Sequence, residues 1–198
     1  MYTSNALTTT FLSLLSLATA LPTTPPTELV PRCGTTILPV LHSISNKNPS
    51  QPAPLTTTFS VSTTVNPAPQ PPTLVNTILT FPSIPANSYG CTIAYRIPSG
   101  TPVTITGNPT LNITTLGPTS AGYTWDSVYA QQPQPFTHGL FGTVNLAQGG
   151  EAVVNSMACP VGGGQLVFMA AIANWVWGSA GVEVAQQNGA GFYLTYNC

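Results

Sequence analysis

Short apolar runs and clusters of turn-forming residues alternate along most of the chain. The runs are rich in Val, Ile, Thr, Tyr and Phe, and Gly, Pro and Asn separate them. Such runs predict β-strands, because branched and aromatic side chains suit a pleated, half-buried surface. Cys91, Ile93 and Tyr95 occupy alternate positions and therefore share one strand face. Ten strands are expected, over residues 57–65, 73–81, 91–97, 103–106, 111–116, 140–146, 152–155, 165–177 (with an interruption), 181–185 and 191–196.

The number and spacing of these runs predict the fold class. About nine or ten short strands separated by turn signals are typical of an all-β protein built as a two-sheet β-sandwich. The 21 prolines oppose helices, because proline removes a backbone donor and clashes with the preceding helical turn. Residues 37–44 are where the sequence allows a short helical turn, and residues 66–72 indicate a long connection between strands.

The start of the chain predicts export. An apolar run at residues 11–20 ends in Ala18-Thr19-Ala20, and a short apolar core closed by small side chains is typical of a signal peptide. We therefore expect residues 1–20 to be a signal peptide; a buried N-terminal helix is the alternative. Residues 21–32 then form a Pro/Thr-rich extended arm, and residues 33–198 form a single β-sandwich domain.

The later sequence predicts no membrane insertion. Its longest apolar run, at residues 166–177, is shorter than the roughly 20 residues that a spanning helix needs, and it contains Asn174. The expected location is therefore secreted and extracellular, either released or associated with a cell wall.

Four cysteines, Cys33, Cys91, Cys159 and Cys198, fit the oxidising compartment that export implies. Their spacing is too wide for a zinc cluster, so we expect two disulfides and no metal site. Four cysteines allow three connectivities. Loop closure alone favours the pairs Cys33–Cys91 and Cys159–Cys198, since these close the shorter loops.

Charged side chains are scarce, and this limits the classes of partner. They make up 4% of the residues, with three basic and four acidic side chains and a net charge of −1. A chain with so few basic groups cannot release many counterions from a phosphate backbone, which excludes nucleic acid as an expected partner. It also lacks the basic cluster that binds an anionic membrane surface.

One acceptor for an N-linked glycan is present, Asn112-Ile113-Thr114. The triplets at residues 48–50 and 108–110 carry proline in the middle position, which prevents glycosylation. A glycan on Asn112 requires that side chain to face solvent, and this would fix one face of the strand at residues 111–116.

Three stretches carry a resemblance to a known family: CGTTILPVL from residue 33, LTFPSIPANSYGCTIAYRIPSG from residue 79 and NGAGFYLTYNC at the end. The middle stretch resembles the pattern of the But2 C-terminal domain family. The resemblance covers most of the mature chain and implies a β-sandwich in an extracellular ascomycete protein. The family is named after binding to a ubiquitin-like activating enzyme, a cytosolic partner that an exported protein does not meet.

Familiar catalytic motifs are missing. The string around Ser179 (WGSAG) lacks the first glycine of a nucleophile elbow. A copper oxidase of polysaccharides needs histidine as its first mature residue, whereas cleavage here leaves Leu21. The glycines at 162–164 are not followed by the Lys-Ser/Thr of a phosphate loop. We therefore expect no cofactor and no enzymatic activity.

Three carboxylates keep one enzymatic alternative open. A glycoside hydrolase needs two carboxyl groups flanking the scissile bond, and Asp126, Glu151 and Glu183 are available. None of them lies in a recognisable motif, so solvated charges that support solubility are the favoured interpretation. His138 and His42 are interpreted in the same way, as a surface and a packing histidine.

Aromatic side chains are the remaining candidates for binding. Tyr123, Trp125 and Tyr129 cluster in AGYTWDSVYA beside an expected loop, where an exposed ring could stack on a sugar. Trp175 and Trp177 would share one side of a regular strand, and filling the sandwich core is the favoured interpretation for the tryptophans.

The leading hypothesis is a secreted, non-enzymatic β-sandwich that associates with cell-wall or extracellular polysaccharide. A secreted effector or elicitor that acts on a host plant protein is the second hypothesis, and a glycan-active hydrolase is the third. The sequence carries no signal for an oligomeric state.

Overall fold

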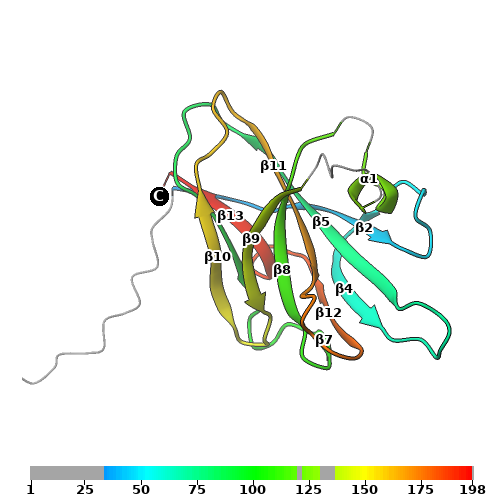
Figure 1. The fold of residues 1–198 in the computed structure, drawn as a ribbon. Coiled ribbons are helices and arrows are strands. Elements are labelled where there is room, and N and C mark those ends of the chain that lie inside the picture. Colours follow the sequence, from blue (N-terminus) through cyan, green and yellow to red (C-terminus); the bar gives the residue numbers. More distant parts are fainter. Residues whose placement is uncertain (1–33, 120–121, 130–136, 198) are drawn as a thin grey trace, which may run out of the picture. The chain divides into compact units, whose positions relative to one another are not determined.

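The computed structural model describes residues 34–119, 122–129 and 137–197, without the side chains of residues 137 and 138. Strands account for 55% of the structure and helix for 3%. Two antiparallel sheets, of four and nine strands, pack against each other, which confirms the predicted all-β sandwich (Figure 1).

The two sheets are called here the smaller and the larger sheet. The smaller sheet has the order β1 (Thr35–Ile37), β13 (Gly191–Tyr196), β6 (Cys91–Arg96) and β10 (Glu151–Met157). The main path of the larger sheet is β7 (Val103–Thr106), β12 (Ala180–Ala185), β4 (Thr58–Thr64), β5 (Thr73–Ile84), β11 (Gly164–Ile172), β8 (Thr110–Leu116) and β9 (Thr137–Asn145). β2 (Val40–Ser45) pairs with β5, and β3 (Leu55–Thr56) pairs with β2.

The main core lies between the two sheets. Alternate residues of the strands point into it, as the period of two in a strand requires. Phe59 of β4 and Phe192 of β13 meet across the interface with ring centroids 4.9 Å apart. Phe168 of β11 contacts the rings of Phe81 and Phe141 on its own sheet, at 6.2 and 5.0 Å. Burial of these rings supplies much of the apolar area removed from water on folding.

A second core lies on the opposite face of β2, β5, β8 and β11. It is covered by the short helix α1 (Trp125–Tyr129) and by the residues before it (Figure 1). Its buried members are Ile44, Ile78, Leu116, Tyr123, Val128, Val167 and Met169. These four strands therefore bury apolar side chains on both faces.

The ten expected strands are all present, and β1, β2 and β3 are additional, so the expected number was too low. The helical turn expected at residues 37–44 is wrong, because residues 40–45 form β2. β2 pairs with β5 from Val40 opposite Thr80 to Ser45 opposite Val75, so a partner distant in sequence decides its conformation. The connection expected at residues 66–72 lies between β4 and β5.

The expected disulfide pairing is wrong. Cys91 is bonded to Cys159, with their Cα atoms 5.1 Å apart, rather than to Cys33. The reason is strand pairing: β6 and β10 are neighbours, Met157 lies opposite Cys91, and Cys159 follows two residues later. Loop length alone gave the wrong pairing, because strand pairing in the sheet brings together two cysteines that are 68 residues apart. Cys33 and Cys198 lie outside the described residues, as do the expected signal peptide at 1–20 and the arm at 21–32.

Among the described residues, no helix is long and apolar enough to cross a membrane.

Candidate functional site

The expected binding residues Tyr123, Trp125 and Tyr129 lie in and just before α1. The helix begins after Thr124, whose Oγ1 accepts a hydrogen bond from Ser127 N at 2.9 Å, while Ser127 Oγ accepts one from Thr124 N at 2.9 Å. This reciprocal pair satisfies backbone donors at the start of the helix in the manner of a capping box. Local polar residues therefore explain why a helix of one turn forms here.

Tyr123 and Tyr129 hold this segment on the larger sheet. The buried Tyr123 donates its hydroxyl to the carbonyl of Gly117 at 2.8 Å. Asn76 of β5 donates Nδ2–H to the hydroxyl oxygen of Tyr129 at 2.7 Å. Burial raises the pKa of Tyr129 to about 12, against a lowering by the bond from Asn76. Both phenols thus take part in packing and hydrogen bonding within the second core.

Trp125 is partly buried and stacks on Tyr129, with ring centroids 4.2 Å apart and an interplanar angle of 26°. One face of the indole is therefore taken up by the tyrosine. The three residues are brought together as the sequence predicted, on a segment that covers the second core.

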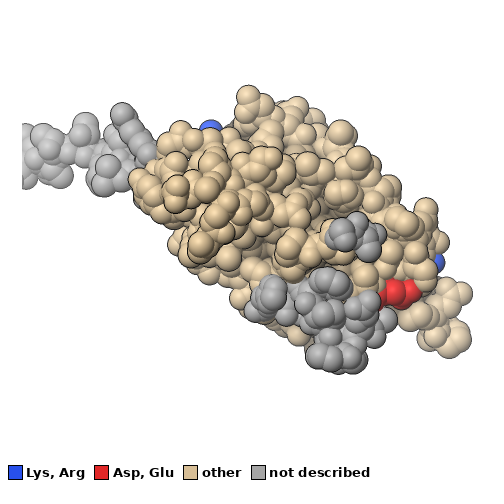
Figure 2. All heavy atoms as spheres, turned by 90° about the horizontal axis from the view of Figure 1, so that it is seen from above, with Lys and Arg blue, Asp and Glu red and all other residues tan. Residues whose placement is uncertain are grey.

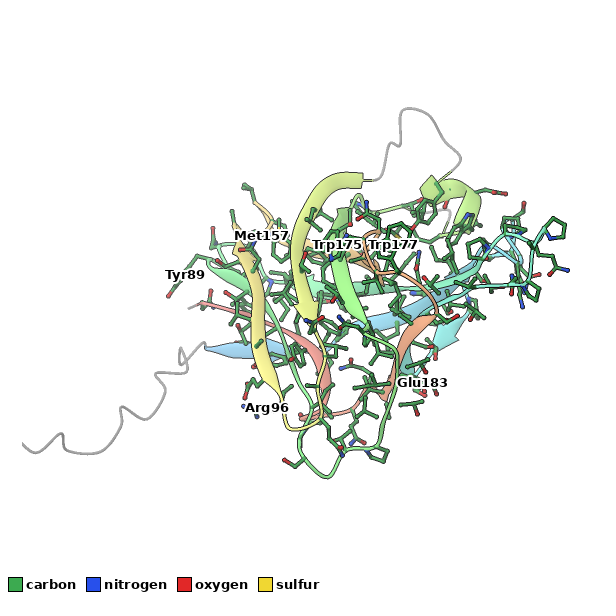
Figure 3. The ribbon with its side chains drawn as sticks, turned by 60° about the horizontal axis from the view of Figure 1, so that its bottom comes forward. Tyr89, Arg96, Met157, Trp175, Trp177 and Glu183 are labelled. Atoms are coloured by element: carbon green, nitrogen blue, oxygen red, sulfur yellow. A yellow bond between two sulfur atoms is a disulfide. The ribbon has the colours of Figure 1, made fainter. Side chains whose placement is uncertain are left out.

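Trp175 and Trp177 lie outside both cores, which contradicts the interpretation that they fill the sandwich. β11 ends at Ile172, so neither residue is in a strand. The side chain of Trp175 is 52% exposed and that of Trp177 is 95% exposed. In Figure 3 the two tryptophans lie in the same part of the molecule, away from Arg96 and Glu183. We call residues 173–179, which carry them, the tryptophan loop.

Backbone hydrogen bonds fix both ends of the tryptophan loop. Ala173 N donates to the carbonyl of Thr110 at 2.8 Å, and Val176 N donates to the carbonyl of Ala173 at 2.9 Å, which closes a turn. At the other end, Val65 N donates to Ser179 Oγ at 3.0 Å. The rings are therefore presented from a segment tied to β8 and to the end of β4.

The tryptophan loop contains no charged residue. Charged side chains are also few on the face that Figure 2 shows from above, where they occur only as isolated spots. Two other large apolar side chains near the ends of this loop are also exposed: Val65, 57% exposed, bonds to Ser179, and Ile105, 42% exposed, is on β7, which pairs with β12. Exposed apolar side chains mark an interaction surface where they form a contiguous patch, so the tryptophan loop is a candidate for one.

The three carboxylates are on three different elements, α1, β10 and β12. Glu151 faces away from the main core on the smaller sheet, where Arg96 Nη2 and the hydroxyl of Tyr193 donate to its Oε1 at 2.9 and 2.7 Å. Asp126 is on α1, beyond the larger sheet, and accepts a bond from Ser50 Oγ at 2.6 Å. The main core therefore separates Asp126 from Glu151.

Glu183 is exposed on β12, opposite Ser60 of β4 and Thr104 of β7. The hydrogen bond from Arg96 lowers the pKa of Glu151 and outweighs desolvation, which raises it. This carboxylate is therefore poorly suited to donate a proton. The arrangement provides no neighbouring pair of carboxylates that includes Glu151.

Asn112 lies on β8, on the face opposite to the main core, and is partly exposed. Its Oδ1 accepts a hydrogen bond from Thr143 Oγ1 of β9 at 3.1 Å. Ile113, the middle residue of the glycosylation triplet, points into the main core. The position of Asn112 is compatible with a glycan.

Among the described residues, no group of three or more His, Cys, Asp or Glu side chains could hold a metal ion. His138 lies at the start of β9 rather than in the loop expected for it.

Comparison with known protein families and with curated proteins finds no match for this chain. The resemblance to the But2 C-terminal domain family therefore stays a prediction from the three sequence stretches that carry it.

The tryptophan loop is the feature that the sequence interpretation missed. The spacing of Trp175 and Trp177 suits one face of a strand, but Asn174 before them and Gly178-Ser179 after them are turn-forming residues. Gly178 has a φ of +81°, a conformation that favours glycine. These flanking residues were the signal that could have indicated a loop.

Proposed function

We propose that the chain is a secreted, non-enzymatic β-sandwich protein that binds cell-wall or extracellular polysaccharide through Trp175 and Trp177. The exposure of these two rings, at 52% and 95%, is the observation that carries the proposal. Exposing two indoles to water is unfavourable, so an exposed pair at the end of a sandwich favours a binding surface.

The chemistry of the loop supports a neutral polysaccharide. The C–H faces of a sugar ring are apolar and flat enough to pack on an indole, while the indole N–H remains able to donate a hydrogen bond. No charged side chain lies within residues 173–179 to attract an anionic polymer. Neutral glucan and chitin are therefore the expected partners among wall polymers.

The hydrolase alternative that pairs Asp126 with Glu151 is not proposed, because these two residues lie on opposite sides of the main core; the pair of Asp126 with Glu183 stays a prediction from the sequence. The two sheets of a sandwich are about 10 Å apart. Carboxyl groups that flank a scissile bond are separated by roughly 5–9.5 Å and face a common cleft. No contact of the described residues favours the host-directed effector over polysaccharide binding.

Retention of the purified protein on insoluble glucan, chitin and isolated plant wall tests the proposal. The double variant W175A/W177A should lose most retention, since it removes both stacking surfaces. Tyr89 is 61% exposed and lies away from both tryptophans in Figure 3. Y89A is therefore the matched control and should bind like the unchanged protein.

W125A separates the present proposal from binding by the α1 aromatics. Retention unchanged in W125A and lost in W175A/W177A supports the tryptophan loop. Equal retention of the double variant and of Y89A, or no retention of the unchanged protein on any of the three materials, contradicts the proposal. Thermal unfolding of each variant shows whether the fold is preserved.

A further inference from the structure

A small cavity opens on the side of the larger sheet that carries the second core. Its volume is about 270 Å³, slightly below the roughly 300–1,000 Å³ of pockets that take drug-sized ligands. The lining comes from β2, β5, the β2–β3 loop, the start of β11 and the segment before α1. The residues used below are His42, Thr80, Gln165, Tyr123, Pro52 and Ala53.

Two polar atoms beside this cavity lack partners within the protein. His42 Nδ1 and Thr80 Oγ1 are buried, and neither has a hydrogen bond. Buried polar groups in folded proteins are nearly always bonded, and a missing bond costs about 1–3 kcal/mol. Neither group therefore stabilises the ligand-free protein through a hydrogen bond. Both side chains line the cavity, but the two atoms are buried beneath its surface, so bonding to a ligand requires that the Thr80 hydroxyl and the His42 ring first rotate toward the cavity.

The lining selects the charge of a ligand. Desolvation lowers the pKa of His42, so its imidazole is neutral near neutral pH. Among the described residues that line the cavity, none is a Lys, Arg, Asp or Glu. An ionic ligand would lose its hydration without gaining an opposite charge, which is costly. The cavity therefore suits an uncharged ligand.

The lining also selects the functional groups of a ligand. A threonine hydroxyl both donates and accepts, and Nδ1 of a neutral histidine donates or accepts according to its tautomer. A ligand hydroxyl can match either role, and the amide of Gln165 adds a further donor and acceptor at the rim. Pro52, Ala53 and Tyr123 supply apolar surface for C–H groups. One sugar ring combines these properties at a suitable size.

We propose that this cavity is a second carbohydrate subsite, which takes a single neutral sugar unit and bonds its hydroxyls to His42 and Thr80. The choice of ligand class rests on the proposed polysaccharide-binding function. The residues differ from those of the tryptophan loop, so the two sites can be tested separately.

Titration of the ¹⁵N-labelled protein with glucose, mannose, galactose and N-acetylglucosamine tests the subsite. A concentration of about 100 mM fills roughly nine-tenths of a site with a Kd of about 10 mM. For at least one sugar, the backbone resonances of His42, Thr80 and Gln165 should shift along a saturable curve. The resonances of Trp175 and Trp177 serve as an internal reference for the other site.

T80V removes the hydroxyl while keeping the shape of the side chain. It should weaken sugar binding about two- to tenfold, the worth of one hydrogen bond. T104V is the matched control, because Thr104 is exposed on β7 and does not line the cavity. T80V should not lower the melting temperature, since it removes a hydroxyl that has no partner in the ligand-free protein; weaker binding then cannot be ascribed to unfolding.

Three results would overturn the subsite: no shift of the cavity resonances with any of the four sugars, shifts that fail to saturate, or equal affinities for T80V and T104V. The first of these means that the cavity holds water only. W175A/W177A should lose retention on wall material and keep the sugar-induced shifts at His42 and Thr80. Loss of the proposed function with these shifts preserved, or the reverse, identifies which of the two claims has failed.

Discussion

The two faces of β2, β5, β8 and β11 are both apolar, but they are covered in different ways. Among the residues that the structure describes, twenty-two buried members make up the main core, contributed by both sheets. The second core has seven, and its cover is a one-turn helix with the residues before it. A sheet covers the first face along whole strands, whereas a single segment covers the second.

The difference lies in what holds each cover in place. The smaller sheet is held on the larger one by apolar area, and the Cys91–Cys159 bond ties β6 to the segment after β10 within the smaller sheet. The segment over the second core depends more on single hydrogen bonds, such as those of Tyr129 with Asn76 and of Ala53 N with the carbonyl of Tyr123 at 2.8 Å. Regions with few buried contacts open locally at low cost, so the second core should open before the main core.

Truncation of a side chain in the main core should lower the free energy of unfolding more than any other change considered below. Phe168 is fully buried and contacts two other phenylalanine rings. F168A should lower the free energy of unfolding by about 3–5 kcal/mol, because it removes a large apolar side chain and leaves a cavity. Denaturant unfolding measures this loss. A loss below about 1 kcal/mol would mean that the main core does not dominate stability.

Removal of the disulfide in the main core should have the second-largest effect on the free energy of unfolding. The bond between Cys91 and Cys159 closes a loop of 68 residues. Replacing both cysteines by alanine should cost about 4 kcal/mol on the chain-entropy estimate, within a usual range of about 2–5 kcal/mol. Denaturant unfolding of the double variant gives the value.

Peptide mapping without reduction checks the pairing itself. A cross-linked peptide containing Cys91 and Cys159 is expected. Four cysteines with this bond leave Cys33 and Cys198 only each other as intramolecular partners. Recovery of a peptide linking Cys33 to Cys91 would contradict the described structure.

Much of the main core could be predicted from the sequence, and much of the second core could not. Residues 91–97 show a period of two, and β6 follows it because the side chains of one face meet the core. Residues 37–44 carry Pro39 within a mixed pattern, and Val40–Ser45 form β2 through pairing with β5 and β3. The alternation of apolar and polar residues along the chain indicates a strand well when one of its faces is buried. When both faces are buried, both sets of positions are apolar and the alternation is lost.

The candidate site, too, could be predicted from the sequence only where its residues are close along the chain. The sequence grouped Tyr123, Trp125 and Tyr129 correctly, because they are close along the chain. It could not tell that β11 ends before Trp175, since strand ends depend on where pairing stops, and pairing with β8 stops at Ile172. The cavity beside His42 is lined by five segments that are separate in the sequence, and no local sequence pattern indicates that they meet.

Truncation of the second core should have a smaller effect than F168A. Val128 is the fully buried residue of α1. V128A should cost about 2 kcal/mol, from the loss of two buried methyl groups and the space they leave. Hydrogen exchange should show faster opening of residues 122–129 and nearly unchanged protection of β6 and β13. Equal acceleration in all of these elements would mean that both cores open together.

Alkaline unfolding should test the contribution of Tyr129, although Tyr193 of the smaller sheet, whose pKa is also raised to about 12, titrates in the same range. Burial raises the pKa of Tyr129 to about 12, so the folded protein holds this proton more tightly than the unfolded chain does. The resulting stabilisation is complete below about pH 10 and is lost as the pH rises toward 12, a change of roughly 1–3 kcal/mol. Y129F removes this titration and should flatten the dependence of stability on pH in that window. Y89F, at an exposed position, should follow the curve of the unchanged protein.

The outer face of the smaller sheet, where Arg96 and Glu151 are exposed, should contribute least to the free energy of unfolding. Arg96 and Glu151 form an ion pair at 2.9 Å there, and their side chains are 48% and 37% exposed. The bond from Arg96 lowers the pKa of Glu151 in the folded state, so the stabilisation is present at neutral pH and is lost as the pH falls through that pKa. E151Q should cost less than about 1 kcal/mol at neutral pH, because solvent screens an exposed pair.

Urea unfolding of E151Q at neutral and acid pH, with and without added salt, measures this smallest effect. The difference from the unchanged protein should shrink in acid, where Glu151 is protonated, and also in high salt, which screens exposed charges. T104V, an exposed substitution on β7 that leaves all charges in place, is the control. A cost for E151Q as large as that of V128A would mean that charge pairing on an open face can match a covered apolar core. The contribution of a sheet face to the free energy of unfolding would then not depend on how completely that face is buried.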